Sequence, residues 1–176
     1  TPIGKIIFGG EQEMNLRAGT ENVAGIVGLG KAIELINQKS KTMPEGKNQK
    51  IIGLRDYFIN KILKEIPDTE LNGSRRSRSP NNTNFYFKYV EGESILLNLD
   101  LKGIAASSGS ACVSLSLSPS HVILSVYDDP ERAHGSIRFT LGENTTREEI
   151  DYVIKNLKVI IKKLRKISPL ARKVGK

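Results

Sequence analysis

The sequence has 176 residues, with 27 Lys or Arg, 19 Asp or Glu, one Cys and no Trp. Apolar types make up 38% and 16 residues are glycine, a composition that supports a buried core and argues against general disorder. The single cysteine excludes an intrachain disulfide framework and a cysteine-based zinc cluster and favours a reducing compartment, and no apolar run approaches the roughly 18 residues of a membrane span.

Two helices are predicted in the first third of the chain. Residues 20–39 place apolar side chains at helical spacing, with Thr20 as a candidate cap. Residues 40–48 are polar, contain Pro and Gly, and indicate a linker. A second apolar stripe predicts a helix over 49–65, which Pro67 ends.

Short apolar pieces and turns follow, and then one long helix. The pieces lie at 69–72, 83–89, 103–106 and 135–141, of which the second and the last are typical of strands, and a short helix is predicted over 92–100. After Asn144–Thr146, an apolar stripe from Ile150 to Ile167 predicts the last helix. The sum is an α+β domain with a small open sheet, preceded by a long connecting helix.

Cys112 lies in the Ser- and Gly-rich segment ASSGSACVSLSLSPSH, residues 106–121. Small polar neighbours favour an exposed, mobile loop over a small buried hydrophobe, which is the alternative for a lone cysteine. An exposed thiol suits chemistry in which a nucleophile takes up a group and carries it away. Spacing alone assigns this thiol no acid–base partner, since His121 and His134 are equally well explained as ordinary polar residues.

Two further positions are candidates for anion binding. In the predicted strand GSIRFTLG, Arg138 points to the face opposite Ile137 and Phe139, where it is either solvent-facing or a clamp for a carboxylate. The run FGGEQEMNLRAGTEN places glycines and Thr20 ahead of a helix, an arrangement that suits an anion but is common in proteins. No metal-ligand cluster is visible in the sequence.

The net charge of +8 is concentrated locally. Nine basic residues and no acidic residue fall between positions 155 and 176, and three arginines fall between 75 and 78. The first explanation is a solvated helix face and a surface loop, and the second is a docking surface for an acidic protein. Few aromatic residues lie near either cluster, which disfavours nucleic acid as a partner.

Taken in order, several segments of this chain resemble one family. The segments are GGEQE, LRAGTENVAGIVGLGKA, PNNTNFYF, YVEGESILLNLD, SSGSACVS, SPSHV and AHGSIRFTLGENTTREEID. Together they resemble the C-terminal part of the cysteine desulfurases of the NifS/IscS type, class V aminotransferases with the fold type I architecture of pyridoxal-phosphate enzymes. The resemblance covers about residues 6–170, and its serine-rich cysteine loop is similar to the longer-loop group of these enzymes.

This resemblance implies a fold and a role for each candidate residue. Residues 1–40 would be the end of the large cofactor domain and the connecting helix, 41–170 the small domain, and 171–176 a basic tail. The small domain would hold a mixed or antiparallel sheet with helices packed on one side. The expected roles are Cys112 as the nucleophile that receives sulfur from L-cysteine, Arg138 as the ligand of the substrate carboxylate, and Thr20 as a ligand of the pyridoxal-phosphate phosphate across a homodimer.

The chain also departs from the family pattern. Glu11 stands where the family has a third glycine, and Met14–Asn15 stands where it has Arg-Gly. No His-Lys pair is present, so the lysine that binds the cofactor is missing. We therefore expect the chain to be the C-terminal portion of a cytoplasmic desulfurase and inactive alone, an expectation that fits a start, TPIGKIIFGG, without an initiator Met or signal-peptide pattern.

Two alternatives to that reading stay open. One is a related pyridoxal-phosphate lyase that acts on selenocysteine. The other is a non-catalytic module that docks an acidic iron–sulfur scaffold or sulfur-carrier protein. The sulfur acceptor, the pathway and the true N-terminus are not fixed by the sequence.

Overall fold

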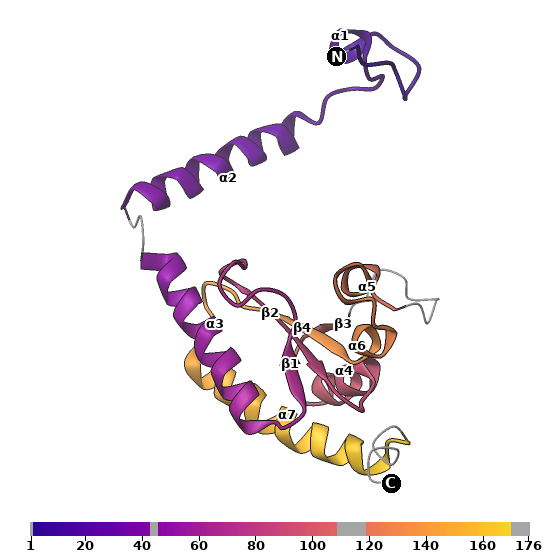
Figure 1. The fold of residues 1–176 in the computed structure, drawn as a ribbon. Coiled ribbons are helices and arrows are strands. Elements are labelled where there is room, and N and C mark those ends of the chain that lie inside the picture. The colour runs from indigo at the N-terminus through magenta and orange to yellow at the C-terminus, as the bar shows by residue number, and fades with distance from the viewer. Residues whose placement is uncertain (1, 43–45, 109–118, 170–176) are drawn as a thin grey trace. The chain divides into compact units, whose positions relative to one another are not determined.

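The computed structural model describes residues 2–42, 46–108 and 119–169 (Figure 1). Contacts divide the chain into two compact units, Thr1–Glu45 and Gly46–Lys176. Cys112 and the predicted basic tail at 171–176 lie outside the described residues.

The first unit contains the short helix α1 (Gln12–Asn15) and the long helix α2 (Val23–Thr42). The predicted cap at Thr20 is wrong. Helix α2 begins at Val23, and the Asn22 side chain accepts a hydrogen bond of 3.0 Å from the Gly25 N–H, as an N-cap does. The predicted linker over 40–48 is also too long, because α2 continues to Thr42 and the next helix begins at Gly46.

The second unit is built on a four-stranded sheet in the order β1-β2-β4-β3, and every neighbouring pair is antiparallel. The strands are β1 (Thr69–Leu71), β2 (Asn82–Phe87), β3 (Ser107–Ser108) and β4 (Ser136–Thr140). Two of them, β1 and β4, fall within the pieces predicted at 69–72 and 135–141, and β2 overlaps the piece at 83–89 but begins one residue earlier, at Asn82. The apolar piece at 103–106 is not a strand, since the residues that pair with β4 are the two serines that follow it.

One face of the sheet carries the hydrophobic core. Helices α3 (Gly46–Glu65), α4 (Gly92–Asp100) and α7 (Arg147–Ile167) contribute apolar side chains to it, and α3 and α7 lie side by side (Figure 1). Phe58 of α3 is 1% exposed, and its ring meets those of Phe85 and Phe139 edge-on at 5.5 and 5.3 Å. Such aromatic packing fixes α3 against the two central strands.

Two short helices, α5 (His121–Tyr127) and α6 (Pro130–His134), follow the segment that contains Cys112. Both have side-chain caps, since Ser120 accepts from the Ile123 N–H and Asp129 accepts from the Arg132 N–H. Helix α6 contacts β2, and its residues Glu131 and Arg132 accept hydrogen bonds from Tyr86 and Ser136, which lie on the face of the sheet opposite the core. These helices therefore connect the cysteine segment to the polar side of the sheet.

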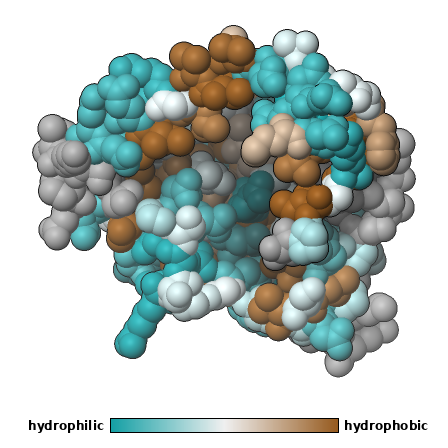
Figure 2. Space-filling model, turned by 90° about the horizontal axis from the view of Figure 1, so that it is seen from above, coloured by the Kyte–Doolittle hydropathy of each residue, from teal (hydrophilic) through white to brown (hydrophobic). Residues whose placement is uncertain are grey.

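Apolar side chains also reach the surface in patches (Figure 2). The exposed large apolar residues of α2 include Ile26, Val27 and Leu29, and none of the residues 2–38 is buried. Among the described helices, none has the length and apolar character needed to cross a membrane.

Candidate active site

Arg138 lies on the polar face of the sheet. Its strand neighbours Ile137 and Phe139 are 0% and 5% exposed in the core, whereas Arg138 itself is exposed, as strand alternation predicts. In the register of the sheet it stands between Asn84 of β2 and Ser107 of β3. No residue that the structure describes forms an ion pair with it, so the guanidinium is available to an external carboxylate.

A buried polar network supports the strands beside Arg138. Asn72 is 5% exposed, and its side-chain amide donates to Asn84 Oδ1 at 2.8 Å and to Ser136 Oγ at 2.7 Å. Ser136 Oγ in turn donates to the Arg132 carbonyl at 2.6 Å, and Arg132 Nε donates to Asn72 Oδ1 at 2.7 Å. The bonds among Asn72, Ser136 and Arg132 form a closed ring that joins β4 and α6, and the bond to Asn84 adds β2.

The Arg132 side chain is the centre of this arrangement. It is 12% exposed, and its Nη1 forms an ion pair of 2.7 Å with Glu70. Its guanidinium also lies 3.9 Å from the centre of the Tyr127 ring and 5.3 Å from that of Tyr86. Because Tyr127 ends α5, Arg132 fastens both short helices to the sheet.

Charges around the network stabilise it. Lys88, and after it Arg132, donates a hydrogen bond to Glu70, and these bonds hold the pKa of that carboxyl below its ordinary value. Burial, together with the Glu131 carboxylate, raises the pKa of Tyr86 well above its usual range. Tyr86 is therefore neutral at physiological pH and donates to Glu131 at 3.2 Å.

Cys112 itself lies outside the described residues, but both sides of its segment are described. On the N-terminal side, β3 is hydrogen-bonded to β4 with Ser107 opposite Arg138. On the C-terminal side, Ser120 is 6% exposed and caps α5. His121 is exposed and is the first residue of α5, the ordinary polar position that the sequence allowed for it.

Thr20 lies in the first unit and Arg138 in the second. It is exposed, and it follows Gly19, whose φ of 103° suits glycine. The Gly19 N–H donates to Gln12 Oε1 at 3.2 Å, and Arg17 Nη1 donates to the Gly19 carbonyl at 2.9 Å. Gln12, to which the sequence assigned no role, thus holds the turn that presents Thr20.

Of the departures from the family pattern, Met14 and Asn15 fall in a strained turn, whereas Glu11 has an ordinary φ of −90°. Glu13, Met14 and Asn15 have φ of 51°, 54° and 65°, in the left-handed region. Asn tolerates that conformation better than most residues, which suits Asn15 to the place where the family has Gly. Met14 has no such advantage. Within the described chain, no group of three or more His, Cys, Asp or Glu side chains lies close enough together to hold a metal ion.

Comparison with known protein families identifies the class of protein to which this chain belongs. Residues 8–153 match the family described as Aminotransferase class-V, and the chain belongs to that family.

Two relatives with similar sequences are both named as cysteine desulfurases. The chain is 56% identical over 170 residues to "Cysteine desulfurase IscS" of Dictyoglomus turgidum, an alignment that covers 96% of this chain and 42% of that protein. It is 49% identical over 171 residues to "Cysteine desulfurase IscS" of Methanosarcina thermophila, with 97% of this chain and 41% of that protein covered. The chain therefore spans about 42% of the length of the first of these relatives.

Solved structures agree with the observed fold. A NifS-like protein from Rickettsia africae superposes with a TM-score of 0.77 at 30% identity, over 92% of this chain and 41% of that one. A second NifS-like protein gives a TM-score of 0.75 at 27% identity, over 93% of this chain and 40% of that one. The expected α+β architecture with a small sheet is thereby confirmed.

The chain fits the family's cofactor, pyridoxal phosphate, only in part. An exposed Thr20 hydroxyl after a glycine turn suits a phosphate, and the unpaired Arg138 suits the carboxylate of an amino acid. The lysine that would bind the cofactor covalently is absent, because neither His121 nor His134 precedes a Lys.

Sequence reasoning missed Arg132, Asn72 and Tyr127. Arg132 reaches Asn72 and Glu70 across 60 and 62 positions of the chain, a separation at which no local pattern operates. One signal was present for α6, since Asp129-Pro130 is the cap and first-turn pair that often begins a helix.

Proposed function

We propose that the chain is the C-terminal portion of a cysteine desulfurase, which converts L-cysteine to L-alanine and retains the sulfur as a persulfide on Cys112. The observation that carries the proposal is Arg138 on the polar face, which has no ion-pair partner among the described residues, with β3, the strand before Cys112, paired beside it. The named function of relatives 49–56% identical to this chain supports the same activity.

Each residue has a defined task in this reaction. Arg138 binds the substrate carboxylate through two parallel hydrogen bonds and orients the amino acid. The Cys112 thiolate attacks the substrate sulfur, so that one S–S bond forms, one C–S bond breaks and the carbon takes up a proton. Pyridoxal phosphate, held by a lysine outside this chain, supplies the electron sink when bound.

Thr20 binds the cofactor phosphate, and in the family's homodimer it does so in the partner subunit's site. The persulfide then passes to a sulfur-acceptor or iron–sulfur scaffold protein. The nucleophile must be a free thiolate at the start of each turnover, and a reducing compartment keeps thiols free, which supports a cytoplasmic setting.

A chimeric enzyme tests this proposal. The matching C-terminal part of the Dictyoglomus turgidum relative is replaced by this chain, which is 56% identical to it. We expect the chimera to release alanine from L-cysteine and to gain one sulfur atom at Cys112, as measured by mass spectrometry of the Cys112 peptide. An inactive, folded and cofactor-loaded chimera would instead favour the docking-only alternative.

Single substitutions in the chimera separate the roles. Cys112→Ser should abolish persulfide, and a sulfur-loaded protein in that variant would refute the nucleophile assignment. Arg138→Gln should lower kcat/KM by roughly 10- to 100-fold, because Gln keeps one donor and the loss of one hydrogen bond to a charged group costs about 1.5–3 kcal/mol. Arg147→Gln, which removes an exposed arginine of α7, is the matched control and should leave kcat/KM unchanged.

Rates on selenocysteine distinguish the remaining enzyme alternative. A chimera that releases alanine faster from selenocysteine than from cysteine, without needing Cys112, would be a selenocysteine lyase.

A further inference from the structure

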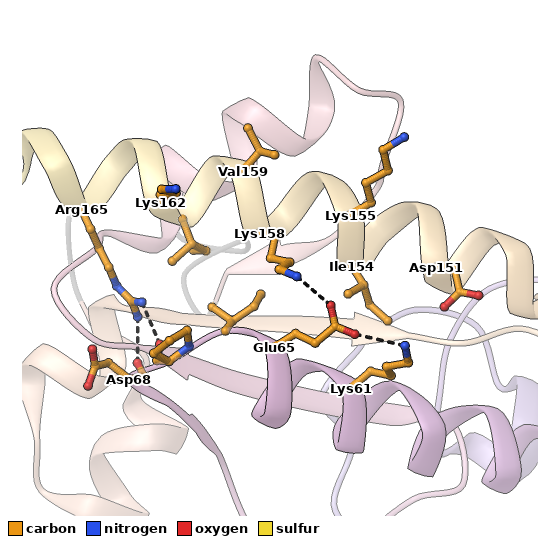
Figure 3. A pocket seen from close by; sticks show the side chains of 13 residues that line it. Lys61, Glu65, Asp68, Asp151, Ile154, Lys155, Lys158, Val159, Lys162 and Arg165 are labelled. Carbon is orange, nitrogen blue, oxygen red and sulfur yellow. Dashed lines mark hydrogen bonds and ion pairs between the residues drawn. The ribbon is translucent and has the colours of Figure 1, made fainter.

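A groove of about 770 Å³ runs between α3 and α7 (Figure 3). Its floor is apolar and includes Ile66, Ile154 and Ile161, side chains that also belong to the core. Val159 of α7 lines the same groove with 66% of its surface exposed. The three isoleucines are 2%, 4% and 1% exposed, so Val159 is the apolar side chain of this group that a partner can reach directly.

Cations surround this apolar floor. Five of them line the groove: Lys61, Lys155, Lys158, Lys162 and Arg165. The four on α7 are spaced by three, four and three positions, so they fall along one side of that helix. Figure 3 shows Lys158 and Lys61 both directed at Glu65, with ion pairs of 3.0 and 3.1 Å.

Most of these charges are already engaged within the protein. The hydrogen bond from Lys158, and then that from Lys61, lowers the pKa of Glu65, so this carboxylate stays ionised between them. Arg165 donates to the carbonyls of Lys88, Pro67 and Asp68 at 3.0, 2.7 and 2.8 Å. These groups build the wall of the groove and are not free to bind a partner.

Lys155 and Lys162 are the two remaining cations of the groove. Both are exposed, and neither forms an ion pair with any residue in the described part of the chain. They are seven positions apart on α7, which is two helical turns and about 10.5 Å along the axis. Two carboxylates at the same spacing on a second helix would match them.

The remaining carboxylates of the groove lie near its ends. Asp151 accepts a hydrogen bond of 2.5 Å from the Tyr57 hydroxyl, and Asp68 lies beside the carbonyls that hold Arg165. From Asp151 to Arg165 the α7 side of the groove is about 21 Å long at 1.5 Å per residue. That length accommodates about four turns of a helix.

We propose that this groove is a docking site for an acidic amphipathic helix of a partner protein. Its apolar side chains would cover the floor and Val159, and its carboxylates would pair with Lys155 and Lys162. Nucleic acid fits less well, because the described lining has no aromatic side chain for stacking and contains three carboxylates. This proposal does not depend on desulfurase activity, so each can fail without the other.

The test uses the whole chain and a labelled helical peptide of about 15 residues, the number that spans the groove. The peptide carries Leu at positions i, i+3, i+4 and i+7 and Glu on both flanks, and a second peptide carries Gln in place of every Glu. We expect fluorescence anisotropy to show binding of the Glu peptide, weakening with added salt, and binding of the Gln peptide about tenfold weaker or less.

Matched variants locate the site. Lys155→Glu with Lys162→Glu should weaken the Glu peptide about tenfold or more, because two attractive pairs become repulsive. Lys163→Glu with Lys166→Glu makes the same change of charge on the same helix outside the groove and should alter binding less than about twofold. Val159→Gln, at an exposed position, should weaken both peptides.

Isoleucine methyl spectra give an independent readout that does not rely on affinity. Peptide should shift Ile66, Ile154 and Ile161 and leave Ile95 and Ile123 unchanged. The proposal is overturned if the Glu peptide does not bind at about 1 mM, or if both double variants weaken it equally. It is also overturned if a single-stranded RNA oligonucleotide binds more tightly and shifts the same methyls.

Discussion

Replacing Arg132 by Met tests whether one buried cation holds the polar side of the sheet together. Methionine keeps an unbranched apolar stem of similar reach but has no charge and no donor. The change removes the hydrogen bond of 2.7 Å to Asn72 and the ion pair of 2.7 Å to Glu70. It also removes the cation that lies 3.9 Å from the Tyr127 ring centre.

The size of the effect follows from the burial of each partner. Asn72 is 5% exposed, so its orphaned side-chain oxygen costs about 1–3 kcal/mol of unfolding free energy. Glu70 is 40% exposed at its side chain, so water screens the lost ion pair to at most about 1 kcal/mol. The lost cation–π contact adds about 1 kcal/mol to the cost. Burial of the apolar methionine side chain offsets part of this loss of unfolding free energy. We expect a net loss of about 3 kcal/mol.

Urea unfolding followed by far-ultraviolet circular dichroism measures this loss. With a slope of about 1.5–2 kcal/mol per molar urea, the midpoint should fall by about 1.5–2 M. Arg132→Lys, which keeps the charge but not the planar geometry, should lie between the parent and Arg132→Met. Arg147→Met is the control, because it removes only an exposed arginine that lies 4.2 Å from the Tyr57 ring, and it should cost at most about 1 kcal/mol. Equal midpoints for Arg132→Met and Arg147→Met would refute the reasoning.

Three further outcomes are expected from the same unfolding assay. Phe58→Ala should cost about 3–5 kcal/mol, since the ring is 1% exposed and packs edge-on against two others; a cost below about 1 kcal/mol would contradict the observed core. Thr146→Ala should cost about 1 kcal/mol by opening the capping box of α7, and Thr146→Ser should restore most of it. The pKa of Glu70 lies below its ordinary 4.5, so its contribution to the free energy of unfolding is present above pH 4.5 and is lost as the pH falls through the pKa of the folded state. Glu70→Gln should therefore reduce the loss of stability on acidification by at most about 1 kcal/mol. A pH profile of stability that Glu70→Gln leaves unchanged would count against the ion pairs.

Elements with strong local signals could be predicted from the sequence. Helix α7 was predicted from a long apolar stripe that follows Asn144–Thr146, and the structure confirms the helix and adds a capping box formed by Thr146 and Glu149. Arg138 was placed on the polar face by strand alternation alone, and its buried neighbours confirm that placement. In each case the deciding interactions lie within a few positions of one another.

Elements that depend on distant contacts could not be predicted in this way. Helices α5 and α6 have seven and five residues, too few for apolar periodicity to appear. They are held by Arg132, whose partners Asn72 and Glu70 are 60 and 62 positions away. The same reason explains the piece at 103–106, because pairing with β4 and not local propensity decides which residues become β3.

The two candidate anion sites differ in how firmly the chain itself holds them. Arg138 belongs to a strand in which the neighbouring side chains are buried, and the hydrogen-bond network of Asn72 lies on the same polar side of the sheet. Thr20 is presented by a turn with only local hydrogen bonds, in a segment without a buried residue between positions 2 and 38. Catalytic geometry must hold to about 0.5 Å, which requires packing around the site. Arg138 is therefore held by packing within the second unit, whereas the turn before Thr20 is held by local hydrogen bonds alone.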